Sequence, residues 1–484
     1  MTKRIICLFL LTVLIVGTFG CTGHTDKNEN ATFEITDTES TPDTEPDIYS
    51  ELPSGDYGGE EFVFANETDS SSWAILMLDV EELTGEVLDN AVYMRNLAVE
   101  DKLGITIRVE EYVHADDVAR AVTQNVMSGE DPYDVYDICA NYAASLILED
   151  VFVDVSTLGL DIEKPWWNDT VMDSLTFADR CYSIAGDLSI MLWEASYGLA
   201  YNKDMAERLG LPDQYELVRE GKWTLDAMNE AMVSAYQSNG DTIVDDDDTF
   251  GMTGADRFMT YMMIAGGENI IHEDEKGLPL FEGLTERMAD MYEKILGVYY
   301  TNDSVFIAHR MRFARSDKTW HTLFTDGNAL YYFEPIGSNV KLRNVAFDYG
   351  FLPMPKYDES QEEYITPIVH YAHTMHVTTA HDDLEMVRVV LENLAAESRK
   401  SVRSVYFDQI LDGKRSKDDG TIEMFDIIFE NQVMNPATIY DWGTITSLIN
   451  SSAYSKKSEI ASRIASITPS VEADLRKTVY YYSK

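Results

Sequence analysis

The sequence predicts an α/β fold built from two domains. The chain has 484 residues, 45% of them hydrophobic, which is enough for two ordinary domains with sizeable cores. Strand and helix patterns alternate over residues 60–141, and an apolar, aromatic stretch follows at Asp179–Leu211. Alternating strands and helices form mainly parallel sheets covered by helices. We therefore expect the aromatic stretch to carry the chain from one such domain into a second.

Three segments of the first domain have the apolar pattern of strands: Glu60–Glu67, 105–110 and Tyr133–Asn141. Apolar residues at helical spacing predict a helix over Thr84–Leu103 that ends at Gly104. A second helix is expected to be capped by Asp116 or Asp117. Ligands of parallel sheets bind beyond the carboxyl ends of strands.

The stretch Asp179–Leu211 combines a strand pattern with polar side chains. Asp187, Trp193 and Glu194 interrupt its apolar residues, and a plain core strand would not need them. The triplet Asn202, Lys203 and Asp204 is expected to end the strand and to offer caps for the next helix. Residues at a crossing between domains face the space between them, so Trp193 and Glu194 are candidate ligand contacts.

Later segments extend both domains. Strands are expected at Gly327–Pro335 and Asp348–Pro355, and a second crossing at His370–Ala380. Helices are expected after Thr224, over Leu284–Tyr299, after Asp382 or Asp383, over Val402–Leu411 and from Ser455 onward.

The N-terminus has the layout of a secretion signal. Two basic residues precede the apolar run Ile5–Val16, and Gly20 and Cys21 follow. The layout resembles a bacterial lipoprotein signal in which Cys21 would be lipidated, although Thr18 and Phe19 depart from the usual pattern. The alternative is ordinary signal cleavage with Cys21 as a bystander.

Composition restricts the partners. Residues 21–55 are rich in Thr, Asp, Glu, Ser and Pro, which predicts a disordered acidic tether. The whole chain has 85 acidic and 37 basic residues, a net charge of −48. Nucleic acids and anionic lipid surfaces require a basic face, so the charge argues against both and favours a soluble extracellular domain.

No cofactor or metal site is expected. Cys139 and Cys181 could form a disulfide or remain free thiols. The loop Asn239–Gly251 faintly resembles a calcium loop but lacks its strict alternation and distal Glu, so a solvated acidic loop is expected. One group of histidines has a spacing of three residues: His370, His373 and His376. A helix would place them on one face for a metal, but the following Val and Thr residues favour a strand.

Catalysis has no sequence support. The chain contains no GxSxG elbow, no HExxH pair and no phosphate-binding GxxxxGK[ST] loop. Pairs of carboxylates, as a glycosidase uses, are inevitable among 85 acidic residues. A secreted carbohydrate-active enzyme is therefore the alternative and not the expected function.

Several blocks together carry a family resemblance: YMRNLAVEDKLGITI, YDVYDICANYAASL, LAYNKDMAERLGL with KWTLDAM, TDGNALYYFEP with FLPMPK, and NLAAESRKSVRSVYFDQIL. They span most of the chain from about Tyr57 to about Asp441. In this order, behind a lipoprotein-like signal and a tether, the chain resembles the extracellular solute-binding proteins of bacterial ABC importers. It is most similar to the sugar-binding, maltose-binding-protein-like branch.

The resemblance implies a two-lobed, periplasmic-binding-protein-like fold of type II with a ligand cleft between the lobes and hinge crossings. Lobe 1 would comprise 56–181 and 326–372, and lobe 2 would comprise 182–325 and 373–484, after a signal at 1–20. It also implies a lipid-anchored, extracellular monomer that captures a sugar or oligosaccharide by hinge closure and delivers it to an ABC permease. Ligand sensing without transport is a further alternative.

Residues at strand ends and crossings are the candidate ligand contacts: Asn141, Tyr142, Trp193, Glu194, Glu334, Tyr371, His373 and Trp442. Trp and Tyr stack on the apolar face of a pyranose, and Glu, Asn and His bond its hydroxyl rim. Each has a structural alternative, such as core packing for Trp193, a lysine partner for Glu194 and packing on a terminal helix for Trp442. Trp166 and Trp167 could also stack on a ligand, although packing at a domain edge is the stronger expectation.

Overall fold

The structure is a computed structural model. It describes residues 48–68, 78–241, 243–300, 303–314, 318–412, 419–454 and 459–484. The predicted signal, Cys21 and most of the predicted tether lie outside these residues. Within the described ranges, no helix is long and apolar enough to cross a membrane.

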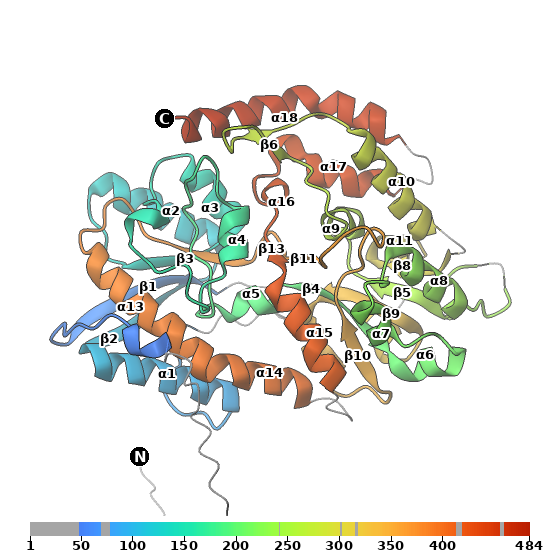
Figure 1. Cartoon of the computed structure of the whole chain (residues 1–484), viewed down its shortest axis with the longest axis horizontal. Coiled ribbons are helices and arrows are strands. Elements are labelled where there is room, and N and C mark those ends of the chain that lie inside the picture. The colour runs from blue at the N-terminus through green and yellow to red at the C-terminus, as the bar shows by residue number, and fades with distance from the viewer. Residues whose placement is uncertain are drawn as a thin grey trace, which may run out of the picture. The chain divides into compact units, whose positions relative to one another are not determined.

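The first of two main sheets has the strand order β12-β3-β1-β2. Its strands are β1 (Glu60–Glu67), β2 (Ile105–Tyr112), β3 (Val135–Cys139) and β12 (His373–His376). β1 is parallel to β2 and β3, whereas β12 is antiparallel to β3. The helices α1 (Val87–Leu103) and α2 (Ala115–Ser128) connect the parallel strands (Figure 1). This confirms the predicted β-α-β-α-β order.

The helix ends follow most of the predicted signals. Gly104 ends α1 in the left-handed region at φ 63°, where glycine has no Cβ to clash. Predicted side-chain caps at Asn202, Thr224 and Asp383 are confirmed, because each accepts a hydrogen bond from a backbone N–H of the first turn. The predicted aspartate cap of α2 is wrong, since the helix begins one residue before Asp116.

The second main sheet has the order β10-β4-β9-β5-β8. Its strands are β4 (Tyr197–Asn202), β5 (Phe250–Gly254), β8 (Val305–Ile307), β9 (Ala329–Pro335) and β10 (Tyr349–Leu352). β5 is parallel to β8 and β9, and β4 is antiparallel to β9 and β10. The associated helices are α6 (Lys203–Leu209), α7 (Gln214–Arg219), α8 (Leu225–Ala235), α9 (Phe258–Ala265), α10 (Glu286–Tyr300), α11 (Ala308–Ala314) and α12 (Trp320–Thr325).

Sheet membership corrects the expected path of the chain. The sequence analysis placed residues 326–372 with the first sheet and residues from His373 onward with the second. Instead, β9 pairs with β4 and β5 in the second sheet, and β12 pairs with β3 in the first. The strand patterns were right, but both strands are fully buried, and burial alone does not reveal which sheet a strand joins.

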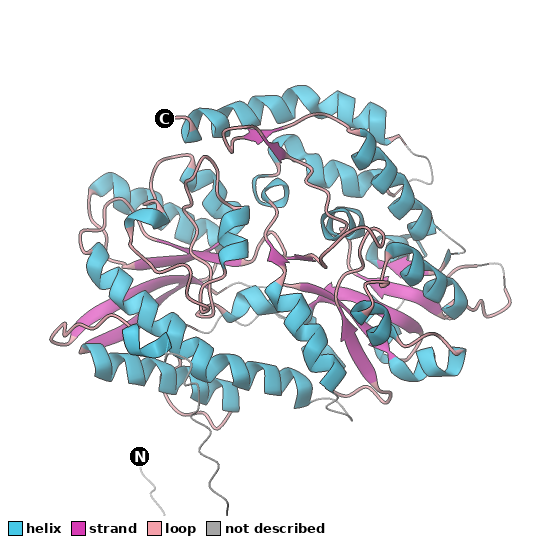
Figure 2. Cartoon of the chain, in the orientation of Figure 1, coloured by secondary structure: helices cyan, strands magenta, loops and turns pink. Residues whose placement is uncertain are grey.

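Later helices pack against both sheets. They are α13 (Leu384–Glu397), α14 (Arg403–Asp412), α15 (Asp419–Glu430), α16 (Pro436–Tyr440), α17 (Ile445–Ser452) and α18 (Ile460–Tyr482). α13 and α14 lie along α1, α15 lies on β10, and α16 contacts α3 (Ala140–Ile147). Figure 1 shows these helices in orange to red, and Figure 2 shows helices in cyan packed around the magenta strands of the two main sheets. Two small strand pairs complete it, β6 (His272–Glu273) with β7 (Pro279–Leu280), and β11 (Thr366–Pro367) with β13 (Gln432–Val433).

The stretch Asp179–Leu211 does connect the two sheets, but it is not one strand. Ile184 forms an antiparallel bridge with Met375 of β12, and the chain then forms a short helix, α5 (Ile190–Glu194), before it enters β4. The Met, Leu and Glu residues of α5 favour a helix. This stretch is buried almost throughout, so its apolar residues do not distinguish the 3.6-residue repeat of a helix from the two-residue repeat of a strand.

Among the described residues, three segments that run between the sheets are bonded to one another. The first contains α5, the second runs from β11 to β12, and the third contains β13. The backbone N–H of Val369 donates to Ala195 O at 3.0 Å, and that of Ile368 donates to Val433 O at 2.9 Å. These bonds join the second segment to the first and to the third.

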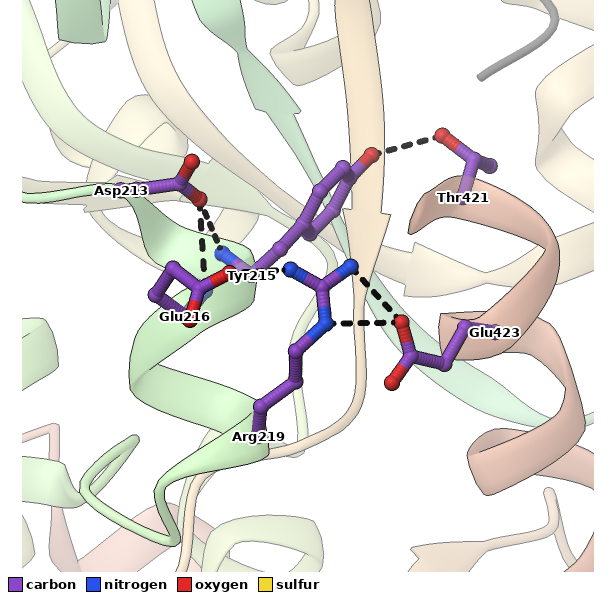
Figure 3. Close-up of polar contacts among 6 residues, drawn as sticks. All are labelled: Asp213, Tyr215, Glu216, Arg219, Thr421 and Glu423. Carbon is purple, nitrogen blue, oxygen red and sulfur yellow. Dashed lines mark hydrogen bonds and ion pairs between the residues drawn. The ribbon is translucent and has the colours of Figure 1, made fainter. Parts of the chain in front are cut away.

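Helix α15, which leads into the third segment, is attached to α7 (Figure 3). The hydroxyls of Tyr215 and Thr421 lie 2.6 Å apart in the interior. At the surface, Arg219 pairs with Glu423 at 2.7 Å and with Glu216 at 2.5 Å. Asp213 caps α7 by accepting from the N–H of Tyr215 at 2.9 Å. These contacts fix α15 beside the second sheet.

We expect the buried contact between α7 and α15 to matter more than the exposed one. Thr421→Val removes a buried hydrogen bond and should lower the free energy of unfolding by about 1–2 kcal/mol. Glu423→Gln removes an ion pair whose carboxylate is 44% exposed and should lower it by less than about 1 kcal/mol. Urea unfolding of both variants measures the difference, and a larger loss for Glu423→Gln would contradict this ranking.

Candidate functional site

A pocket of about 240 Å³ lies where the first crossing segment meets the later helices. Its walls come from residues 162–170, which lead into α4 (Asp169–Ser174), from the segment of α5, and from residues at α14, α15 and β13. Its aromatic and polar lining includes Trp167, Trp193, Asp187, Arg399, Arg403 and Gln432. The pocket thus draws on parts of the chain more than 200 residues apart.

The tryptophan pair on one wall is held by a single buried carboxylate. Trp166 and Trp167 both donate their indole N–H to Glu392 Oε2, at 2.8 and 3.2 Å. The other oxygen of Glu392 accepts the backbone N–H of Asp161 at 2.6 Å. Trp166 is 1% exposed and packs in the core near Tyr49, as the structural alternative expected. Trp167, in contrast, also borders the pocket.

The second tryptophan of the pocket stands on α5. Trp193 is 3% exposed, and its ring lies 5.2 Å from Tyr406 and 5.6 Å from Phe407, measured between centroids. It packs in the core, as its structural alternative expected, and it also lines the pocket. The aromatic neighbours restrict the rotation of its ring.

Charged groups of opposite sign face the same pocket. Arg399 Nη1 lies 2.9 Å from Asp187 Oδ2. Burial raises the pKa of Asp187, and the nearby charges of Arg403 and Arg399 oppose that rise. Burial lowers the pKa of Arg403, whose guanidinium lies over the ring of Phe407 at 5.2 Å. No described residue completes a hydrogen bond to Arg403 Nε. A buried guanidinium N–H of this kind suits an acceptor on a ligand.

Two amides link the pocket to the crossings. Asn168 Nδ2 donates to Gln432 Oε1 at 2.5 Å, and Asn168 Oδ1 caps α4 by accepting from Val171 N. Gln432 Nε2 donates to Leu192 O at 2.9 Å and to Ser196 Oγ at 2.6 Å. A movement between the crossing segments would therefore also move the pocket wall.

Of the eight predicted ligand contacts, only Trp193 lines this pocket. Asn141 and Tyr142 are half-buried in the first turn of α3, and Tyr371 is half-buried with its ring 4.9 Å from that of His370. Trp442 is buried and donates its indole N–H to Thr478 Oγ1 of α18 at 2.9 Å. That contact is the packing on a terminal helix named as its structural alternative.

His373 is buried at the edge of the first sheet. Its Nδ1 lies 2.9 Å from Asp137 Oδ2, and its Nε2 lies 3.3 Å from Glu67 Oε2. Burial alone would lower the pKa of His373, but the carboxylate of Asp137 outweighs burial and raises the pKa well above its ordinary value. The thiol of Cys139 lies 2.9 Å from Glu67 Oε2, beside His373. Cys139 and Cys181 are both free thiols and do not form the disulfide that the sequence left open.

Glu194 and Glu334 are buried carboxyls near the same end of the β4–β9 pairing, where Glu334 lies opposite Gly198 and Glu194 precedes β4. Burial raises the pKa of each to about 7. The indole N–H of Trp320 donates to Glu334, and the hydroxyl of Ser338 lies 3.2 Å from it. The neighbours that oppose this rise in pKa at Glu194 are the Tyr406 hydroxyl and Arg343, and not a lysine. Both acids therefore remain largely protonated in mildly acidic solution.

Residues missed by the sequence analysis supply most of the polar lining. Arg399 and Arg403 are four residues apart, a spacing that places both on one helix face, and this signal was available. Asp187 was already conspicuous as a polar residue in an apolar stretch. Gln432 had no local signal, because its role depends on contacts with segments more than 200 residues away.

The raised pKa of Glu194 predicts a pH-dependent stability difference. A raised folded-state pKa stabilises the fold fully below the ordinary value of 4.5, and this contribution is lost as the pH rises through about 7. Glu194→Gln removes that loss. We expect the difference in unfolding free energy between Glu194→Gln and the natural chain to shift in favour of the variant by about 2 kcal/mol between about pH 5 and about pH 8. Urea unfolding at both pH values, with the exposed Glu423→Gln as control, should show this change only at Glu194.

The fold is shared with solved bacterial binding proteins. One is UgpB from Mycobacterium tuberculosis in complex with glycerophosphocholine, at 15% identity and a TM-score of 0.54, with 87% of this chain and 99% of that chain covered. Another is the maltose/maltodextrin-binding domain MalE from Bdellovibrio bacteriovorus bound to maltotriose, at 12% identity and a TM-score of 0.52, with 86% and 100% covered. A third is the ABC substrate-binding protein Lmo0181 from Listeria monocytogenes in complex with cycloalternan, at 13% identity and a TM-score of 0.50, with 88% and 98% covered. At these identities the similarity shows the two-lobed α/β fold alone.

Sequence comparison gives the family. No curated protein is similar enough to the chain to count as a match. The sequence model of the family described as "Bacterial extracellular solute-binding protein" matches residues 98–383, which is more than half of the chain. The matched range includes the first crossing, β12 and the tryptophan wall of the pocket. The chain therefore belongs to the bacterial extracellular solute-binding proteins.

Proposed function

We propose that the chain captures a sugar or oligosaccharide in the pocket bounded by Trp167 and Trp193 and delivers it to an ABC permease. The observation that carries the proposal is the combination of two fixed indoles with the Asp187–Arg399 pair in one pocket. Indole faces suit the CH face of a pyranose, and the charged pair and amides suit its hydroxyls. Two structural neighbours, described as bound to maltotriose and in complex with cycloalternan, support a carbohydrate ligand.

Hinge closure is the proposed mode of capture. Lobe 1 would contain the first sheet, including β12, and lobe 2 would contain the second sheet, including β9. The three bonded segments between them would bend while both sheets remain rigid. Closure would exclude water from the pocket and thereby strengthen its polar contacts. On this proposal the protein binds its ligand unchanged and is not an enzyme.

Replacement of a pocket arginine should weaken carbohydrate binding. A thermal-shift screen of the purified chain against a carbohydrate panel would first identify the ligand. Arg399→Gln should then raise its dissociation constant at least about tenfold in calorimetry, because a charged hydrogen bond contributes about 1.5–3 kcal/mol.

Arg388→Gln is the matched control for this experiment. Arg388 lies on α13, forms a surface ion pair with Glu385 and does not line the pocket, so its loss should leave affinity unchanged. Equal loss in both variants would argue against this pocket as the site. Hydrolysis products in the same mixtures would favour the alternative of a carbohydrate-active enzyme.

We further propose that Cys21 carries a lipid that holds the protein at the extracellular face of the cell membrane as a monomer. The expected signal and acidic tether support this arrangement. Cys21→Ser should release the chain from the membrane fraction into the medium, whereas Cys181→Ser should not. If Cys21→Ser also remains in the membrane fraction, Cys21 is excluded as the anchor. If the protein serves transport, its loss should also abolish permease-dependent uptake. If it only senses the ligand, uptake should persist without it.

A further inference from the structure

A compact group of potential metal ligands lies where β1 and β3 end beside β12. Glu67, Cys139 and His373 each place one ligand atom of a different kind, and the three atoms lie within 4.8 Å of one another. All three residues are buried. We propose that they bind a divalent transition-metal ion of the zinc type, with Asp137 as a positioning residue.

The distances are close to those that a metal requires. Cys139 Sγ lies 2.9 Å and His373 Nε2 lies 3.3 Å from Glu67 Oε2. Ligand atoms about 2.0–2.3 Å from a tetrahedral zinc ion are about 3.3–3.7 Å from one another. The sulfur–oxygen distance would have to lengthen by less than about 1 Å, and the sulfur–nitrogen distance is already below 4.8 Å. The mixture of sulfur, nitrogen and oxygen ligands favours zinc or cobalt over calcium or magnesium.

The histidine is oriented as metal-binding histidines are. Asp137 Oδ2 lies 2.9 Å from His373 Nδ1 and can accept its N–H, which directs Nε2 toward Glu67 and Cys139. Within the described part of the chain, no atom completes a hydrogen bond to the buried Nε2. By contrast, both ring nitrogens of the neighbouring His376 are used, by Tyr182 O and by Thr374 Oγ1.

A hydrogen-bonded cluster without a metal is the competing explanation. The Cys139 thiol can donate to Glu67, and that bond satisfies both groups without an ion. In that cluster, Nε2 of the fully buried His373 has an ion-pair contact with Glu67 at 3.3 Å but no completed hydrogen bond. On metal binding, the Cys139 thiol and the protonated Nε2 of His373 would each release a proton to solvent, so that thiolate sulfur and neutral imidazole nitrogen bind the ion. Water or a solute group would complete the coordination.

The proposed metal site differs from the one weighed on the sequence. That alternative used His370, His373 and His376, and only His373 belongs to the present group. β12 supplies His373, whereas Glu67 and Cys139 come from β1 and β3, more than 200 residues earlier. The group shares no residue with the carbohydrate pocket, so either proposal can fail while the other stands.

Cobalt titration of the purified chain tests the site. After treatment with a chelator, Co²⁺ is added both to the folded chain and during refolding, so that slow access to a buried site does not hide binding. We expect one equivalent to produce a thiolate-to-cobalt charge-transfer band in the near ultraviolet and the visible bands of tetrahedral cobalt, both removed by one equivalent of Zn²⁺. Absence of these bands under both conditions would overturn the proposal.

Matched cysteine variants identify the thiolate. Cys139→Ser should abolish the charge-transfer band, whereas Cys181→Ser should retain it, because Cys181 is not part of the group and its thiol donates to the backbone carbonyls of Met172 and Ser183. A band that survives in Cys139→Ser would overturn the assignment. Circular dichroism verifies folding. If Cys139→Ser does not fold, Asp137→Asn should weaken cobalt binding about 10–100-fold while the band keeps its shape, and unchanged affinity would count against the site.

Discussion

Hydrogen bonds hold together three segments that cross between the two sheets, and two of these segments also line the pocket. Gln432 is their most connected side chain, since its amide bonds Leu192, Ser196 and Asn168. The side chain is buried, so each of these bonds is made in a medium where an unpaired amide would be costly. The same residue lines the pocket, which couples the geometry of the crossings to that of the binding surface.

Burial and charge are balanced differently at the two polar centres of the molecule. In the pocket, Asp187 is paired with Arg399 while a guanidinium N–H of Arg403 has no partner in the described part of the chain. Beside the first sheet, His373 lies between two carboxylates and a thiol. Both centres keep unsatisfied buried polar atoms, and such atoms are rare in native folds unless a ligand, ion or water binds them.

The local elements could be predicted because their signals are local. Gly104 and the side-chain caps at Asn202 and Thr224 act within one turn of their helices, and the structure confirms them. The sheet to which β9 and β12 belong could not be predicted in this way. Both are short and fully buried, so their residue patterns fit either sheet, and only long-range pairing decides between them.

Local residue patterns indicated the fold class and the place of the first crossing, because periodicity and caps are properties of neighbouring residues. The order of several sequence blocks carried the resemblance to the solute-binding family. Tertiary structure alone decided that Trp167, Arg399 and Gln432 share one pocket, and that Glu67, Cys139 and His373 form one group. These residues are separated by up to several hundred positions in the chain. Their convergence depends on how the sheets and crossings pack, and no local pattern in the sequence specifies that packing.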